Sequence, residues 1–330
     1  MRGMLWQPAL AAFVITLICL SLLLTELGRR LVLDRPNERS LHQHPVPRTG
    51  GLAIIAGVAG GCLVGAPGFG VTFGLAAALA VLSFLDDLFN VWTWIRLALH
   101  LLAASAMLLF ELRFPGWILF VVFALALAWY ANLYNFMDGS DGLAGGMALI
   151  GFGAYAIAAA LGEAHPLAEL SVVLAAASGA FLLRNFHPAS IFMGDVGSVP
   201  LGFLAGALGL CGWNDGVWPL WFPILVFAPF VCDATLTLVK RLLHRERVWQ
   251  AHRDHYYQRL VRMGFGHRGT AAIEYAVMLG CAAIALLARE ASVALQITAL
   301  ALAAAALVAI AVWVDMRWAR FEGRASGAAT

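Results

Sequence analysis

The strongest constraint on this chain is a series of long, uninterrupted apolar runs. Of its 330 residues, 62% are hydrophobic and only 12% are charged, and the mean hydropathy is +0.83. Soluble domains carry about 25% charged residues, and a soluble fold of this length could not bury so much apolar surface. The runs are rich in Leu and Ala and do not alternate, which excludes a transmembrane β-barrel. The sequence therefore predicts an all-α polytopic membrane protein.

Charged and turn residues divide the apolar runs into about eleven predicted transmembrane helices, with ten as the alternative count. The predicted spans are 9–27, 51–66, 69–85, 96–112, 117–133, 143–161, 167–183, 197–213, 218–239, 270–288 and 291–314. We expect a single integral membrane domain over residues 1–330, without a soluble domain or an internal repeat. We interpret the first run as a retained span because it lacks a small-residue cleavage site and directly precedes Arg29 and Arg30.

The distribution of basic residues predicts how the chain is oriented. One set of alternate loops carries 18 of the 21 Lys and Arg residues, and the other set carries only Arg2, Arg113 and Arg289. The positive-inside rule then predicts a periplasmic N-terminus and a cytoplasmic C-terminus. The Ala-rich last span is expected to be a lipid-facing anchor, followed by a cytoplasmic tail. The net charge of +2 gives no indication of a nucleic-acid partner.

Acidic residues gather in three of the predicted cytoplasmic loops. Each lies at the end of an apolar span and most lie beside glycine; they are Asp86, Asp87, Asp138, Asp141 and Asp195. Taken singly, each has a simpler explanation as a solvated helix end, a turn or an N-cap. Acids at membrane depth are costly and usually functional, so their recurrence on one side favours a binding site. Carboxylates with open water positions suit Mg²⁺.

Basic and histidine residues occur in two of the same loops. The first loop contains Arg39, His42, His44 and Arg48, and the loop after the ninth span contains His252, Arg253, His255 and Arg259. Positive-inside topology and contact with anionic lipid explain the basic residues from Lys240 to Arg247, but topology does not require histidines. A helical turn starting near His252 would place His255 on the same face. Carboxylates for a metal and cations for phosphates together predict a phosphoryl-transfer site.

Five stretches of the sequence carry a resemblance to a known family. They are Pro47-Arg-Thr-Gly-Gly51, Asp86–Asp87, Asn132-Leu-Tyr-Asn-Phe-Met-Asp-Gly-Ser-Asp-Gly142, Asn185 through Ser198, and the loop from His252 to Gly264. In order, spacing and sidedness they resemble the polyprenyl-phosphate N-acetylhexosamine-1-phosphate transferases, the MraY/WecA superfamily, over about residues 1–290. The segment beginning at Ala251 looks most like the branch that initiates lipopolysaccharide O-antigen.

The resemblance implies a reaction, its partners and a set of site residues. The reaction is transfer of a sugar 1-phosphate from a UDP-N-acetylhexosamine to undecaprenyl phosphate, with release of UMP, at the cytoplasmic side of the bacterial inner membrane. The implied cofactor is Mg²⁺ or Mn²⁺, held by Asp195 and Asp87, and a homodimer is allowed. The implied catalytic residues are Asp86, Asp87, Asp195 and His255. The implied substrate-binding residues are Arg48, Asn132, Asn135, Asp138, Asp141, Asn185, Phe192, His252 and Arg253, with Asn185 and Phe192 beside the uracil.

Two questions stay open at the level of sequence. The first is mechanistic: the lipid phosphate can attack directly, which we favour, or a phosphoryl-aspartate can form on Asp195. The second is functional, because a secondary transporter or flippase is also multispanning and would hold acids near the bilayer midplane. Only Asp233 fits that position, and we expect it to support the site from behind. A CDP-alcohol phosphotransferase is rejected because Asp141-Gly142 is followed by neither arginine nor an acid before Glu163.

Overall fold

The computed structural model describes residues 5–26, 33–34, 41, 45–65, 68–89, 91–112, 116–247 and 252–327. The described chain is almost entirely helical, with one antiparallel pair of two-residue strands, β1 (Leu33–Asp34) and β2 (Val46–Pro47). The helices are α1 (Trp6–Leu23), α2 (Gly50–Gly65), α3 (Gly70–Phe89), α4 (Thr93–Glu111), α5 (Trp117–Phe136), α6 (Leu143–Leu161), α7 (His165–Asn185), α8 (Asp195–Asn214), α9 (Trp221–Val226), α10 (Ala228–Leu243), α11 (Tyr256–Leu260), α12 (Gly266–Ala288) and α13 (Val293–Gly327). A π-helical turn, Val261–Phe265, joins α11 to α12.

The helices confirm the predicted fold class. Within the described residues, nine helical segments are long and apolar enough to cross a membrane, and α2 is a shorter apolar helix of 16 residues. The prediction of one continuous ninth span over 218–239 is wrong, because Phe227 separates α9 from α10. Pro229, in the first turn of α10, has no N–H to donate to the preceding turn, and its ring restricts the backbone before it. The chain is therefore a multi-pass membrane protein with a broken helix in its C-terminal half.

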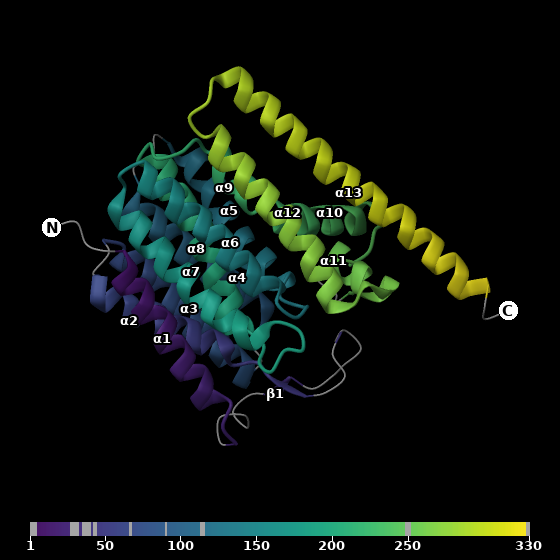
Figure 1. The fold of residues 1–330 in the computed structure, drawn as a ribbon, viewed down its shortest axis with the longest axis horizontal. Helices are drawn as coiled ribbons and strands as arrows, with labels where there is room; N and C mark the ends of the chain where they lie inside the picture. The colour runs from purple at the N-terminus through teal and green to yellow at the C-terminus, as the bar shows by residue number, and fades with distance from the viewer. Residues whose placement is uncertain are drawn as a thin grey trace.

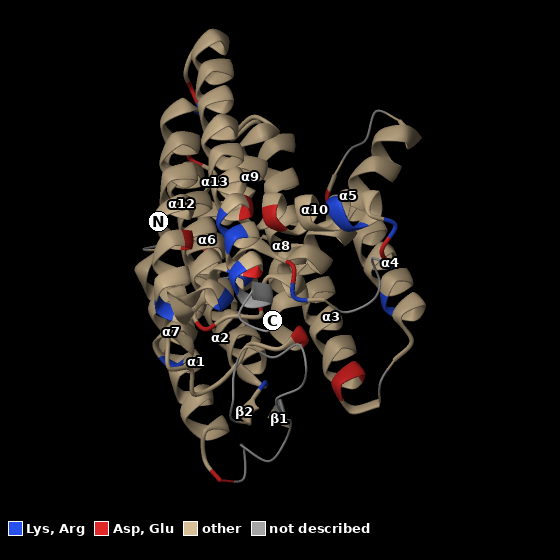
Figure 2. Ribbon diagram, turned by 90° about the vertical axis from the view of Figure 1, so that its right-hand side faces the viewer, with Lys and Arg blue, Asp and Glu red and all other residues tan. Residues whose placement is uncertain are grey.

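Helix α8 is the centre of the bundle. Every residue from Val196 to Gly212 is buried, because α2, α3, α5 and α6 all pack against this helix. A helix that is apolar on all sides belongs in such a position. Helices α1, α2, α6 and α7 also pack on one another. Figure 2 shows long uncharged stretches of helix, with Lys, Arg, Asp and Glu gathered in a few places.

Helix α13 runs back alongside α12 and continues past it, as Figure 1 shows. Most of its apolar side chains are exposed, among them Ile297, Leu302 and Val308, which suits a helix that faces lipid. The segment after the predicted span 291–314 continues as helix to Gly327. Near that end Val314 and Trp318 are buried, because this part of α13 packs against α11.

Candidate active site

Three carboxylates and two arginines meet where α2, α4 and α8 begin and α3 ends. The Arg48 Nη2 atom lies 3.1 Å from Asp195 Oδ1 and 3.6 Å from Asp87 Oδ1. The Arg96 Nη1 atom lies 2.6 Å from Asp86 Oδ2 and 3.8 Å from Asp195 Oδ2. We call these five residues the carboxylate–arginine cluster. Its carboxylates are 9–18% exposed and its arginines 31–34%, so the guanidinium groups lie nearer the surface.

Small residues bring Arg48 and Asp195 together. A Cβ atom on Gly51 would overlap the backbone of Gly197, so the first turns of α2 and α8 touch through their backbones. Gly194 has φ 68°, a conformation that glycine adopts at little cost, and a Cβ there would overlap the carbonyl oxygen of Arg48. The glycines that the sequence suggests as turn formers therefore also permit a close approach of two helices.

Backbone hydrogen bonds fix the segment before α8 against the segment before α2. The Phe192 N–H donates to the Pro47 carbonyl at 2.7 Å, and the Gly50 N–H donates back to the Phe192 carbonyl at 2.9 Å. Phe192 is half-buried. Three cations expected in the same loop, Arg39, His42 and His44, lie outside the described residues.

The two asparagines at the end of α5 have different surroundings. The Asn135 side-chain amide donates to Asp195 Oδ2 at 3.3 Å, and its carbonyl oxygen accepts from the Ser198 hydroxyl at 2.9 Å. The Asn132 amide donates to the Ala128 carbonyl at 2.7 Å and lies 3.2 Å from His100 Nδ1. Asn135 is thus joined directly to the carboxylate–arginine cluster, whereas Asn132 turns towards α4.

The turn between α5 and α6 carries a second charged cluster around Asp141. This buried carboxylate lies 2.6 Å from His187 Nδ1 and 3.8 Å from His267 Nδ1, and the two imidazoles stack with centroids 5.3 Å apart. The Ser140 hydroxyl lies 2.9 Å from His267 Nδ1. Asp138, in the same turn, is half-buried. The turn therefore connects the start of α12 with the segment between α7 and α8.

Asn185 shapes the loop that contains Phe192. Its side chain is buried; the amide oxygen accepts from the Gly142 N–H and the amide nitrogen donates to the Ile191 carbonyl, each at 3.0 Å. Both polar atoms are therefore used within the fold. The structure places Asn185 in a supporting position, from which it fixes the backbone of the loop that contains Phe192.

The imidazole ring of His255 pairs with the carboxylate of Asp233 on α10. The His255 Nδ1 atom lies 3.0 Å from Asp233 Oδ1, and the same carboxylate accepts the backbone N–H groups of Tyr256 at 3.0 Å and Tyr257 at 2.9 Å. Asp233 thus accepts the first two backbone N–H groups of α11. The Tyr257 hydroxyl donates to the Phe136 carbonyl at 3.1 Å.

The expected helical turn starting at His252 is wrong. Residues 252–254 are not helical and α11 begins at Tyr256, because the Asp233 carboxylate sets the helix start there. The rings of His252 and His255 still lie with centroids 4.9 Å apart. Burial, and then the neighbouring His255 and Arg241, lower the pKa of His252 to about 4, so this ring is neutral at pH 7. Arg253 is half-buried, and its carbonyl oxygen accepts from Arg262 Nη1 at 3.4 Å.

The carboxylate–arginine cluster has donors suited to a divalent cation. No group of three or more His, Cys, Asp or Glu side chains with metal-binding geometry occurs among the described residues. Mg²⁺ needs only one or two carboxylates when water and phosphates supply its other ligands. Three carboxylates against two guanidinium groups leave one net negative charge. Asp195 and Asp87, which share Arg48, therefore fit the expected metal ligands in number and chemistry.

Several residues of the site are not identified by the sequence motifs. In the sequence, Arg96 serves only as one of the basic residues that predict the membrane orientation. It nevertheless follows Asp86 by ten residues across a short turn. That spacing, with both residues at helix ends, is the signal that could have identified the pair. His100, His187 and His267 have no comparable signal, because their partners lie far away in the sequence.

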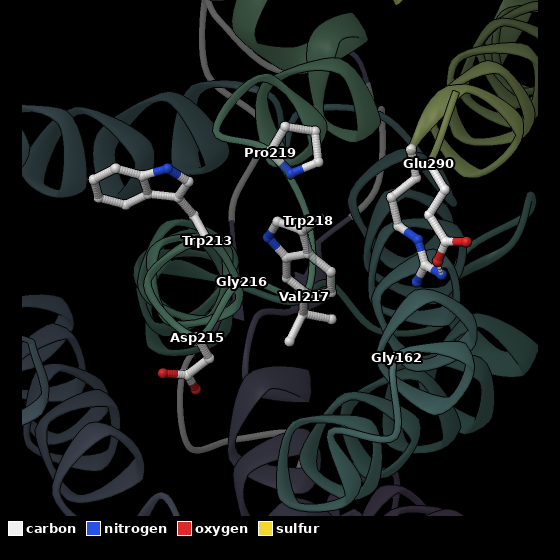
Figure 3. A pocket seen from close by; sticks show the side chains of 9 residues that line it. Gly162, Trp213, Asp215, Gly216, Val217, Trp218, Pro219 and Glu290 are labelled. Carbon is white, nitrogen blue, oxygen red and sulfur yellow. Dashed lines mark hydrogen bonds and ion pairs between the residues drawn. The ribbon is translucent and has the colours of Figure 1, made fainter. Parts of the chain in front are cut away.

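A cavity of about 490 Å³ (Figure 3) lies at the helix ends that are opposite to the carboxylate–arginine cluster. Its lining includes Gly162 after α6, Trp213 in the last turn of α8 and Arg289 after α12. The carboxylate–arginine cluster lies at the start of α8, and 20 helical residues span about 30 Å. This cavity is therefore separate from the candidate active site.

Fold and site together define a multi-pass membrane protein with a charged site at its helix ends. The family model described as glycosyl transferase family 4 matches residues 69–212. A probable undecaprenyl-phosphate N-acetylglucosaminyl 1-phosphate transferase of Bacillus subtilis is 30% identical over 293 residues, which cover 81% of this chain and 81% of that protein. The chain therefore belongs to the superfamily of polyprenyl-phosphate N-acetylhexosamine-1-phosphate transferases, which confirms the resemblance seen in the motifs.

Two further relatives extend the comparison. A decaprenyl-phosphate N-acetylglucosaminephosphotransferase of Mycobacterium tuberculosis is 30% identical over 290 residues, covering 73% of this chain and 71% of that protein. An undecaprenyl-phosphate alpha-N-acetylglucosaminyl 1-phosphate transferase of Yersinia pestis is 28% identical over 264 residues, which cover 72% of this chain and 71% of that protein. The names of these relatives share one reaction class and differ in the polyprenyl carrier.

Proposed function

We propose that this protein transfers an N-acetylhexosamine 1-phosphate from a UDP-sugar to undecaprenyl phosphate and releases UMP. The observation that carries the proposal is the carboxylate–arginine cluster at the ends of membrane-spanning helices. Its position suits a reaction between a lipid phosphate, which stays at the membrane surface, and a water-soluble nucleotide. The names of the relatives support the same reaction class.

Charge neutralisation is the first task of such a site, because both substrates carry phosphates. Planar guanidinium groups bind phosphate oxygens through paired N–H donors. Arg48 and Arg96 are the more exposed members of the cluster, so we assign them to phosphate binding. A divalent cation held by Asp195 and Asp87 would stabilise negative charge on the pyrophosphate.

The lipid phosphate needs little help to become a nucleophile. The second pKa of a phosphate monoester is about 6, so most of the acceptor is a dianion at pH 7. In the direct reaction, an acceptor oxygen bonds to the β-phosphorus, the bond from that phosphorus to the bridging oxygen breaks, and UMP leaves with the electron pair. Asp86 accepts from Arg96 at 2.6 Å and from the Val91 N–H at 2.7 Å. We therefore assign Asp86 to positioning. We favour direct attack over a phosphoryl-aspartate on Asp195 because the acceptor phosphate is already nucleophilic at pH 7.

The nucleotide is assigned to the side formed by the α5–α6 turn and the Phe192 loop. Asp138 and Asp141 lie in the turn, and Asn185 ties that turn to the loop through Gly142. An aromatic ring at Phe192 would stack on the uracil. His252 and His255 would contact the pyrophosphate from the α11 side, where His255 is fixed by Asp233.

The site is assigned to the cytoplasmic face of the bacterial inner membrane. The loops that contain the cluster belong to the set with 18 of the 21 Lys and Arg residues, which predicts this side. The product would begin a lipid-linked glycan, and the segment beginning at Ala251 favours O-antigen. A transporter is disfavoured because the Asp233 carboxylate is used to cap α11 and hold His255.

The proposal is tested by acceptor-dependent release of UMP. Purified protein in lipid nanodiscs is incubated with UDP-N-acetylglucosamine, undecaprenyl phosphate and Mg²⁺, and UMP is quantified by chromatography. We expect release only when the lipid phosphate is present, and loss of release when EDTA removes the metal. A parallel series with 6-deoxy UDP-N-acetylhexosamines identifies the sugar by kcat/KM. No acceptor-dependent UMP from any of these donors would contradict the proposal.

A further inference from the structure

The last part of α13 differs from the rest of the helix in what it touches. Earlier apolar side chains such as Ile297 and Leu302 are 61% and 65% exposed, whereas Val314 is 1% and Trp318 is 9% exposed. Val314 forms a small apolar cluster with Tyr256 and Leu260, separate from the main core. The end of α13 therefore has its own packing partner, which is α11.

A carboxylate on α13 joins three elements at this point. Asp315 Oδ2 accepts from Lys240 Nζ of α10 at 2.5 Å, and Asp315 Oδ1 accepts from Arg259 Nη1 of α11 at 3.0 Å. The Tyr256 hydroxyl lies 3.4 Å from the same carboxylate and accepts from Lys240 at 2.5 Å. An ion-paired network of this kind is stronger than an isolated surface pair.

Aromatic rings of α13 add contacts with neighbouring arginines. The Arg262 guanidinium lies 4.6 Å and the Arg259 guanidinium 5.7 Å from the centre of the Trp318 ring. Both distances lie within the range of a cation–π interaction. Trp318 therefore covers the outer side of α11 and of the π-helical turn that follows it.

Tyr256 connects this outer network to the candidate active site. Its backbone N–H donates to Asp233 on the inner side at 3.0 Å, and its hydroxyl lies 3.4 Å from Asp315 on the outer side. His255 directly precedes Tyr256 and pairs with the same Asp233. The helical stretch from Tyr256 to Phe265 is interrupted before α12 at Gly264, which has φ 98°. A helical segment this short is not stable without tertiary contacts.

We propose that residues 311–318 of α13 form a brace that holds α11 and thereby positions His255. Asp315 is the central positioning residue, and it acts through Tyr256 and Arg259. A surface that only attracted anionic lipid would not need a carboxylate among its basic residues. In the brace, the Asp315 carboxylate is needed because it joins Lys240 of α10 to Arg259 of α11. The role in catalysis rests on the proposed transferase function, but the mechanical role of the brace does not.

The test compares Asp315→Asn with Asp315→Glu in the full-length protein in nanodiscs. Asp315 is 35% exposed, so neither change leaves a fully buried polar group. We expect amide hydrogen exchange in residues 256–263 to become about tenfold faster in Asp315→Asn. We expect kcat to fall about fivefold while the KM for the UDP-sugar stays within about twofold, because only the position of His255 changes. Asp315→Glu should recover most of both losses.

The matched control is Asp215→Asn, an exposed acid at the other end of α8, which should change neither readout. Unchanged exchange in residues 256–263 of Asp315→Asn would overturn the brace whatever the activity does. Faster exchange with unchanged kcat would overturn the positioning role. Should the wild type release no UMP, the proposed function fails, and the exchange measurement alone then decides whether the brace exists.

Discussion

Arg48 Nη2 and Asp195 Oδ1 lie 3.1 Å apart although 147 positions separate them in the sequence. The contact depends on two glycines, Gly51 and Gly197, which let the first turns of α2 and α8 touch. Asp195 also accepts from Asn135 of α5 and lies 3.8 Å from Arg96 of α4. Side chains from α4, α5 and the segment before α2 therefore meet at one carboxylate of α8, which makes Asp195 the centre of the candidate site.

Neutralising Asp195 should abolish transfer. Asp195→Asn keeps the shape of the side chain but removes the charge that a hard cation requires, so we expect activity to fall at least about a hundredfold at saturating Mg²⁺. Membrane insertion and the apparent melting temperature in detergent should be close to wild type. Asp215→Asn, an exposed acid at the other end of α8, serves as the control. If Asp195→Asn kept more than a few per cent of wild-type activity, Asp195 would not be a ligand of the divalent cation.

Removing the positive charge of Arg96 should damage both activity and stability. In Arg96→Met the carboxylates of Asp86 and Asp195 lose a shared partner, and an unpaired, largely buried charge costs several kcal/mol. We expect kcat to fall at least about tenfold and the melting temperature to fall as well. Arg184→Met, at an exposed position on α7, provides the comparison. Equal kcat values for Arg96→Met and Arg184→Met would show that Arg96 has no role in the candidate active site.

The sequence predicts the helices better than it predicts their interruptions. Among the described residues, ten of the eleven predicted apolar runs each correspond to one helix, because runs of this length and composition have few other options in a membrane. The break at Phe227 is not evident from hydropathy, since the residues on both sides are equally apolar. The packing of Trp318 on α11 is not predictable either, because it depends on how far α13 extends beyond its apolar segment.

For the site, the sequence predicts which residues are used better than it predicts their partners. Asp86, Asp87, Asn135 and Asp195 come from motifs, and the structure brings them together. Arg96 is missed because it is counted only among the basic residues that set the topology, although its spacing of ten residues from Asp86 could have identified the pair. Pairings such as Asp141 with His267 depend on tertiary contacts over more than a hundred positions, which no local spacing encodes.

Truncating Phe192 should weaken nucleotide binding in particular. Stacking of a base on an aromatic ring contributes about 1–3 kcal/mol, so in Phe192→Ala we expect the KM for the UDP-sugar to rise about tenfold. The KM for undecaprenyl phosphate should stay near wild type. Phe186→Ala changes a second aromatic residue of the same segment, 38% exposed, and should leave both values unchanged. A raised acceptor KM with an unchanged nucleotide KM would instead place Phe192 in the lipid-binding groove.

Replacing His255 should slow the chemical step. His255→Gln keeps a polar side chain but removes the ring that Asp233 holds at 3.0 Å. A preorganised donor facing developing negative charge contributes about 3–4 kcal/mol, so kcat should fall at least about a hundredfold with little change in KM. His244→Gln, an exposed histidine after α10, is the matched control. A loss that extra anionic lipid restores would assign His255 to membrane attachment.

The low pKa of His252 predicts how stability depends on pH. Burial lowers this pKa to about 4, against about 6.5 in an unfolded chain. Between these values the unfolded chain binds a proton that the folded chain does not, so stability falls as the pH decreases from about 6.5 to about 4. In His252→Gln this contribution is absent, and the melting temperature should decline less over that range. If the melting temperatures of wild type and His252→Gln declined in parallel over this pH range, His252 would not be buried in its neutral form.

The fate of the donor's β-phosphate tests the central assignment most directly. Protein in nanodiscs is given UDP-N-acetylglucosamine labelled with ³²P in the β-phosphate, together with undecaprenyl phosphate, and lipid and aqueous phases are separated. Transfer of a sugar 1-phosphate predicts that the label moves to the lipid while unlabelled UMP appears in the aqueous phase, and that Asp195→Asn stops both. Label that stays in the aqueous phase as UDP while the sugar moves to the lipid would contradict the account.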